Sequence, residues 1–279
     1  MIASFGETLI FLISTPLYLI CIGVEIIISS IHKHHRYSVK GTWQNFYIML
    51  VSLVIDLGMR AVALFTLTVF FSHHSLQIHN AVVYWILLFL LQDLAFYTMH
   101  FVDHKVRLFW AVHVTHHSSE EFNLGVGFRS SVFEPLYRFV YFIPIVLLGF
   151  APLDIFFVFS ITQLYGIFIH TQYINRLGFL EWFMATPSHH RVHHGKNPQY
   201  IDRNMGMFLI VWDRLFGTFT PEKEPVIYGI TKPPKTDSPD EVILHEFRSM
   251  MQDVKQAPDI KSKLMYIFGP PGWQHRESK

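Results

Sequence analysis

Charged residues are scarce in this sequence. Only 15% of its 279 residues are Asp, Glu, Lys or Arg, against about 25% in an ordinary soluble domain. The net charge of +1 gives no basic field, so nucleic acid is not an expected partner. The single cysteine, Cys21, excludes an internal disulfide and any cysteine-based zinc site. Apolar residues make up 51%, so a lipid bilayer is the expected solvent.

The apolar residues are grouped into five long segments. The first three are long enough to cross a hydrocarbon core of about 30 Å as helices, so we expect a multi-pass integral-membrane protein. The fourth contains Arg138 and Pro144, so it and the fifth are predicted either to span or to form a hairpin that enters from one side. The segments are Thr8–Ile31, Phe46–Phe71, Val82–Phe101, Val132–Phe150 and Leu153–Ile174.

The Lys and Arg residues between the segments predict an orientation. The loop after the first segment holds Lys33, Arg36 and Lys40, whereas Ser72–Asn80 holds neither Lys nor Arg. The third segment exits into Lys105 and another basic residue. The positive-inside rule therefore predicts an outside N-terminus and a cytosolic position for the chain after the third segment. The membrane would be the endoplasmic reticulum in a eukaryote and the inner membrane in a bacterium.

The fold class that follows is all-α, a membrane helical bundle with a cytosolic helical cap. We expect membrane spans in residues 1–81, a catalytic region in 82–220, and a C-terminal loop and helix in 221–279. Asp240–Val254 has the spacing of an amphipathic helix, and it is preceded by a Pro-rich loop.

Ten of the 18 histidines lie between residues 100 and 194, and most of them follow a spacing rule. One pair has the form HxxxH (box one, residues 100–104), and two triplets have the form HxxHH (box two, residues 113–117, and box three, residues 190–194). Positions three and four apart share one face of a helix, so these imidazoles can converge on a metal. The predicted metal ligands are His100, His104, His113, His116, His117, His190, His193 and His194.

The number of imidazoles indicates two metals, because a structural zinc ion takes four ligands and a catalytic one about three. The zinc-protease pattern HExxH is absent, since Phe101 follows His100. Two irons with nitrogen ligands and open positions for O₂ fit best. We interpret seven histidines outside these groups as polar tips at the membrane boundary. These are His32, His34, His35, His73, His74, His79 and His275.

Several further polar residues are candidates for supporting roles. His170 ends the fifth segment and is a candidate ninth ligand. Asp93 and Gln163, each about two helical turns before a histidine, are candidates either to orient ligand imidazoles or to bond between helices. His189 and Glu120 are placed next to the predicted ligands rather than among them, although Glu120 and the following Glu121 also fit an exposed helix end. In the second segment, Asp56 and Arg60 are predicted to form an ion pair.

With these boxes the chain resembles the fatty acid hydroxylase / sterol desaturase superfamily, and within it the alkylglycerol monooxygenase branch. The similarity covers roughly residues 90–273. It is carried by the boxes and by Trp110–Asn123, Ile169–Gly178, Thr186–Asn204, Trp212–Phe219, Tyr228–Pro233 and the terminal GPPGW.

The resemblance implies two iron ions held by the box histidines together with His170, and hydroxylation of a lipid chain with O₂. It also implies a cytosolic electron donor, which is tetrahydrobiopterin in the alkylglycerol enzyme. Lys105 replaces the acidic residue that follows the first box in that branch, so the lipid and the pterin stay open. Three alternatives also stay open: a desaturase on the same site, a zinc-dependent membrane hydrolase and a metal transporter.

Overall fold

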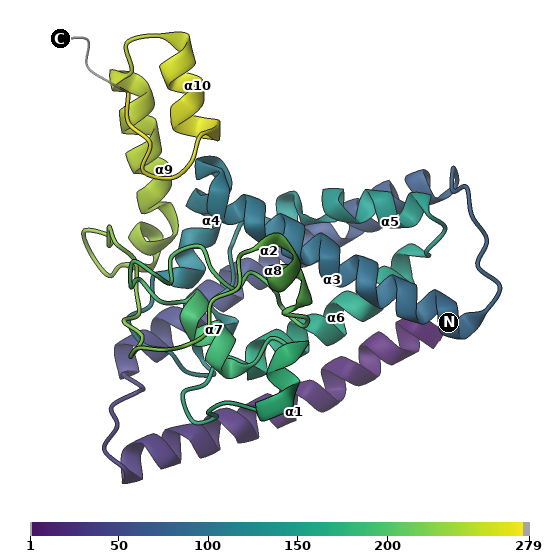
Figure 1. Ribbon diagram of the computed structural model, residues 1–279, viewed down its shortest axis with the longest axis horizontal. Helices are drawn as coiled ribbons and strands as arrows, with labels where there is room; N and C mark the ends of the chain where they lie inside the picture. The colour runs from purple at the N-terminus through teal and green to yellow at the C-terminus, as the bar shows by residue number, and fades with distance from the viewer. Residues whose placement is uncertain (1, 276–279) are drawn as a thin grey trace.

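Three long apolar helices form the body of the computed structural model, which describes residues 2–275 (Figure 1). They are α1 (Ile2–Ile31), α2 (Val39–Phe71) and α3 (Ala81–Lys105). All three are long and apolar enough to cross a membrane. At about 1.5 Å per residue, even the 25-residue α3 reaches about 37 Å, which exceeds the thickness of a bilayer core. The prediction of a multi-pass membrane protein is therefore confirmed by the length and composition of these three helices.

The fourth and fifth apolar segments form a hairpin of shorter helices. The elements η3 (Arg138–Phe142) and α5 (Ile143–Leu147) lead to α6 (Pro152–Phe168). Ser75 in the loop between α2 and α3 donates a backbone hydrogen bond to Leu147 O at 3.1 Å. Gly149 has a φ of +96°, and a Cβ there would lie 2.2 Å from Leu76 O. The tip of the hairpin therefore packs tightly on the loop between α2 and α3.

The hairpin fills the space between the long helices with apolar side chains. Leu88 and Met99 of α3 are buried against Val146 of α5 and Ile155 of α6. At its first end, Arg138 forms ion pairs with Asp56 of α2 and with Glu134. Asp56 thus has a partner in the hairpin, and its pairing with Arg60 stays a prediction.

Most of the other elements lie at the end of the bundle where α3 stops, whereas α8 (Val211–Phe216) lies over α3 (Figure 1). The amphipathic helix predicted at 240–254 is confirmed as α9, which packs on α4 through an ion pair of Arg107 with Glu246 at 2.8 Å. The elements are α4 (Arg107–His117), η1 (Val126–Phe128), η2 (Glu134–Leu136), η4 (Gly178–Trp182), α7 (Pro187–His193), α8 (Val211–Phe216), α9 (Pro239–Gln256) and α10 (Ile260–Phe268). Within residues 2–275, the only extended pairing consists of two isolated β-bridges. The all-α fold is therefore confirmed.

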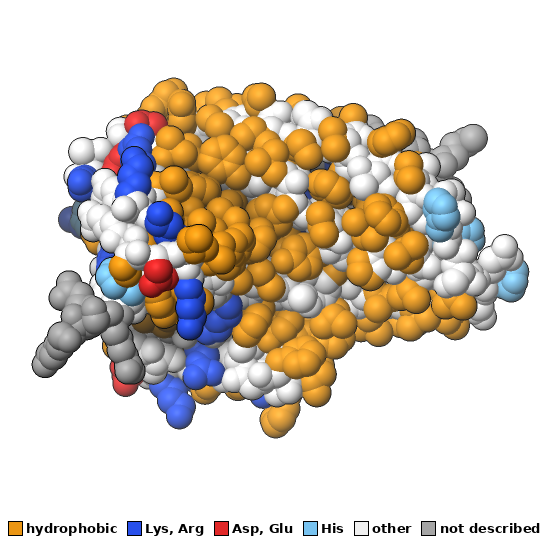
Figure 2. Space-filling view, turned by 90° about the horizontal axis from the view of Figure 1, so that it is seen from above, with side chains coloured by type: hydrophobic (Ala, Val, Ile, Leu, Met, Phe, Trp, Pro, Cys, Tyr) orange, Lys and Arg blue, Asp and Glu red, His pale blue; other side chains and the backbone are white. Residues whose placement is uncertain are grey.

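The surface of the protein is charged at one end of its long axis and apolar over the rest. Figure 2 shows Lys, Arg, Asp and Glu side chains concentrated at one end and an apolar surface over the body. Exposed residues such as Leu12 on α1, Val54 and Phe65 on α2 and Val82 on α3 belong to this apolar surface. Such a surface fits lipid rather than water.

Candidate metal centre

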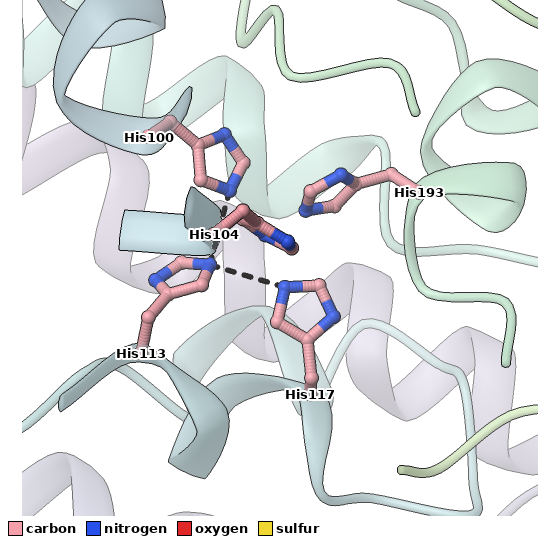
Figure 3. Close-up of side chains that lie close together, drawn as sticks. All are labelled: His100, His104, His113, His117 and His193. Atoms are coloured by element: carbon pink, nitrogen blue, oxygen red, sulfur yellow. Dashed lines mark hydrogen bonds between the residues drawn. The ribbon is translucent and has the colours of Figure 1, made fainter. Parts of the chain in front are cut away.

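Nine histidines from four parts of the fold meet at the polar end of the bundle. His100 and His104 come from the last turns of α3, three more come from α4, His170 follows α6, and the last three come from α7 and its C-terminal residue. They form two groups whose ligand atoms lie within 4.8 Å of one another. Cluster one is His100, His104, His113, His117 and His193, which Figure 3 shows pointing toward a common centre. Cluster two is His116, His170, His190 and His194.

The outer nitrogens of these rings are held by carbonyl oxygens. His100 Nδ1 contacts Met205 O at 2.7 Å, His116 Nδ1 contacts Arg129 O at 2.9 Å, and His170 Nδ1 contacts Gly166 O at 2.7 Å. His193 Nδ1 contacts Arg203 O at 3.0 Å. A carbonyl can only accept, so each Nδ1 carries the proton and each Nε2 presents a lone pair. This is the tautomer that a metal ligand needs.

The inner nitrogens of His116 and His170 have no proton to share with each other. His116 Nε2 and His170 Nε2 lie 3.3 Å apart, and both are unprotonated by the carbonyl contacts above. Two lone pairs at this distance repel unless a cation lies between them. In cluster one, His104 Nε2 and His193 Nε2 are buried without a hydrogen-bond partner in the described chain. The residues therefore fit two bound cations.

A proton is a poor candidate for that cation. Burial lowers the pKa of His116 to about 4, and the pKa of His113, His190 and His194 falls well below the ordinary value. Burial is the largest cause in each, and neighbouring imidazoles lower the pKa further. Neutral imidazoles that converge in a buried site are the donor set of a transition metal.

One short loop, residues 202–205, supports three ligands of cluster one. Two of its carbonyls hold His100 and His193, as described above. Asp202 Oδ1 contacts His104 Nδ1 at 3.3 Å, while Lys105 Nζ lies 2.5 Å from Asp202 Oδ2. Lys105 thus holds the carboxylate that orients His104. The loop was part of a motif in the sequence, but its supporting role was not predicted.

The shape of this loop depends on strained residues and on a buried acid. Asp202 and Asn204 have φ values of +57° and +55°, a region that Asp and Asn tolerate better than other side chains. Asp213 is fully buried and accepts hydrogen bonds from Met205 N at 2.7 Å and Gly206 N at 2.8 Å. The positive φ values that mark the loop are visible in the structure and not in the sequence.

Asp93 and His189, which the sequence predicted as supporting residues, bond to the backbone of the chain. Asp93 bonds the backbone of Phe208 and Leu209 rather than an imidazole. His189 Nδ1 accepts a hydrogen bond from Thr186 N in a capping box that begins α7, so it shapes the helix that carries box three. Its pKa is lowered to about 4 by burial.

Two of these candidates lie outside hydrogen-bonding contact with the clusters. Gln163 has a buried Nε2 without a hydrogen-bond partner among the described residues. Glu120 is exposed and lines a surface cavity with Tyr228, which agrees with the exposed helix-end interpretation that the sequence favoured over a contact with the imidazoles. The physical reason is that the chain turns outward after α4 ends at His117.

The fold and the site define a class, that of membrane proteins with a two-cluster histidine metal centre. Residues 85–218 match the model of the fatty acid hydroxylase family. The chain belongs to this family. Its membership explains why the clusters fall within the matched region.

Curated relatives agree with this assignment. Alkylglycerol monooxygenase of Xenopus tropicalis is 43% identical over 190 residues, which cover 68% of this chain and 42% of the relative. The Caenorhabditis elegans protein of that name is 30% identical over 271 residues, covering 92% of this chain and 53% of the relative. Ornithine lipid hydroxylase OlsE of Rhizobium tropici is 32% identical over 143 residues, covering 50% of this chain and 43% of the relative. The chain spans about half the length of these relatives. No solved structure matches it significantly.

Proposed function

We propose that this chain is a membrane-bound di-iron monooxygenase that hydroxylates an aliphatic C–H bond of a lipid with O₂. The observation that carries the proposal is the pair of buried histidine clusters at the end of an apolar bundle, in each of which the carbonyl contacts leave two Nε2 lone pairs that face the centre of the cluster. Cluster one and cluster two would each hold one iron. When bound, the irons would supply O₂ binding and an oxidant strong enough for an unactivated C–H bond.

The chain itself would supply geometry and exclusion of water. Backbone carbonyls orient the imidazoles, and nearly all ligand side chains are buried. Buried aromatic rings cover cluster two, because Phe122 lies 5.5 Å from the His170 ring and 5.2 Å from the His194 ring. A lipid chain held along the spans would meet the site from the apolar side, since the clusters begin where α3 leaves the apolar body.

Hydroxylation needs two electrons from outside, and the polar end offers a place for their delivery. Tyr228 stacks on Phe122 with ring centroids 4.9 Å apart. Tyr228 also lines two surface cavities of about 390 and 530 Å³. We infer that the cytosolic electron donor approaches this face, where two aromatic rings separate the surface from cluster two. Tetrahydrobiopterin fits this proposal only by resemblance to the alkylglycerol branch.

The lipid is proposed as a class, namely a fatty acyl, ether-lipid or sterol-like chain. The relatives named above include enzymes named for alkylglycerol and for ornithine lipid. Lys105 binds Asp202 instead of providing an acid after box one, so the surroundings of His104 differ from that branch. The proposed orientation places the clusters at the cytosolic face, in the endoplasmic reticulum or a bacterial inner membrane. We also propose the catalytic region as residues 82–220, between the spans of 1–81 and the C-terminal region of 221–279.

Isotope labelling tests the proposal. The purified, iron-loaded chain in lipid vesicles is supplied with ¹⁸O₂ and a chemical reductant, and the extracted lipids are analysed by mass spectrometry. We expect one ¹⁸O atom in the product and none with His193→Ala. A product that lacks two hydrogens and carries no ¹⁸O would assign the site to a desaturase. Lipid cleavage without any O₂ requirement, in protein that holds only zinc, would assign it to a hydrolase.

A further inference from the structure

The segments on either side of box three pair as a short antiparallel ribbon along the bundle. The ribbon consists of residues 183–185 and 208–210, which are joined by two backbone hydrogen bonds of 2.8 and 3.0 Å. The element η4 leads into its first strand, and α8 follows its second strand. In Figure 1, α8 lies over α3 within the bundle rather than beyond its end.

A buried carboxylate fixes the depth of the ribbon. Asp93 accepts hydrogen bonds from Phe208 N at 3.2 Å, Leu209 N at 3.1 Å and Trp212 Nε1 at 2.9 Å. Asp93 is the central residue of α3, with twelve residues on each side of it in the helix. If α3 spans a bilayer, its middle lies near the bilayer middle, and so does everything bonded to Asp93. Non-helical backbone is tolerated there only when its polar groups are satisfied, and Asp93 satisfies two of them.

Aromatic contacts independently give the same depth. The Phe208 ring lies 5.0 Å from the Phe89 ring of α3 and 4.5 Å from the Tyr165 ring of α6. Phe89 precedes His100 by eleven residues, or about 16 Å along the helix. The ribbon therefore extends from the metal centre well into the apolar part of the bundle.

The outer face of the ribbon and its flanking helices is apolar and exposed. We define the ribbon patch as Phe179, Trp182, Phe183, Val211, Leu215 and Phe216. Phe179, Trp182 and Leu215 are 73%, 72% and 68% exposed. Arg214 joins the two halves of the patch, because its guanidinium lies 5.3 Å from the centre of the Trp182 ring and donates to Glu181 O at 3.0 Å.

We propose that the ribbon patch is inserted into the lipid bilayer, as a membrane-contacting element beside the three spans. The patch would contact the bilayer itself, because the ribbon is bonded to the middle of a span and the exposed side chains beside it are large and apolar. Asp93 is then the residue that allows irregular backbone at membrane depth, and the patch places lipid directly beside the loop that orients cluster one.

Spin labelling tests this proposal without reference to iron or activity. The full chain with Cys21→Ser receives one new cysteine at a time, at Phe179, Trp182 or Leu215 in the patch. Val54, which is 71% exposed on α2, provides the lipid-facing reference. The exposed Lys232 provides the aqueous reference. Each labelled variant is reconstituted in phospholipid vesicles, and the collision rates of the nitroxide with O₂ and with a water-soluble nickel chelate are compared.

We expect the patch labels to collide preferentially with O₂, as the Val54 label does. A patch label that collides with nickel as the Lys232 label does would overturn the proposal. Labels shielded from both reagents would also overturn it, because a second copy or another protein would then cover the patch. Each outcome is separable from the proposed function, since the measurement needs neither metal nor substrate.

Discussion

Replacing Asp202 with glycine removes the carboxylate that orients His104 in cluster one, while all the histidines of the cluster stay in place. Asp202 has a φ of +57°, so glycine keeps the backbone unstrained where alanine would strain it. The change deletes the contact of 3.3 Å that orients His104, whose side chain is only 4% exposed. Loss of such a partner lowers metal affinity by about 10–100-fold, or about 1.4–2.7 kcal/mol.

The matched control is Lys105→Met, which removes the ion pair but keeps the contact between Asp202 and His104. The Lys105 side chain is 42% exposed, and a pair of this kind contributes about 0–1 kcal/mol. We therefore expect at most about a five-fold loss of affinity in the control. Asp202→Asn should fall between the two, since its amide oxygen still accepts a hydrogen bond but carries no charge.

The assay is titration of the metal-free protein with Fe²⁺ under anaerobic conditions, against a competing chelator. Wild type should bind two ions, and Asp202→Gly should weaken one of them while cluster two keeps its affinity. Equal weakening of both ions would contradict the separation into two clusters. Unchanged affinity at both would contradict the role of Asp202.

The remaining predictions concern ligands, stability and depth. His193→Ala should bind one metal instead of two. His189→Gln should keep both metals and lower the melting temperature, because the substitution disrupts only the cap of α7. Metal analysis of both variants tests these two expectations. Adding a chelator to the metal-loaded protein should lower its melting temperature, since metal at 100 times its dissociation constant stabilises the fold by about 2.7 kcal/mol; an unchanged melting temperature would argue against bound metal. Asp93→Leu should destabilise the fold by about 2–6 kcal/mol, because Phe208 N and Leu209 N lose their acceptor. The control Thr98→Leu, at an exposed position of the same helix, should change the melting temperature little.

The histidine spacing was sufficient to predict most of the imidazoles that the structure brings together, because positions three and four apart on a helix share a face. His170 was an isolated residue in the sequence, and only the return of α6 to the polar end places it in cluster two. The division into two clusters could not be predicted, since each triplet contributes to both: His113 and His117 belong to one and His116 to the other. Spacing along one helix does not determine which metal each ring meets.

The supporting groups were harder to predict for a physical reason. Most of them are backbone carbonyls, which every residue has, so no residue type marks them. Asp93 stands out in the sequence as a costly polar residue within a span. Its partners could not be predicted, because they are 115 and more residues away in the sequence. Asp202 gave a local signal only through its positive φ, which a sequence does not state.

The central claim is that each chain holds two irons in adjacent histidine clusters. Mössbauer spectroscopy of the ⁵⁷Fe-loaded protein, combined with iron and protein quantitation, tests it most directly. We predict two irons per chain, with both irons in nitrogen-rich sites and magnetically coupled after oxidation. A single uncoupled iron per chain, or a protein that takes up zinc and excludes iron, would contradict the account.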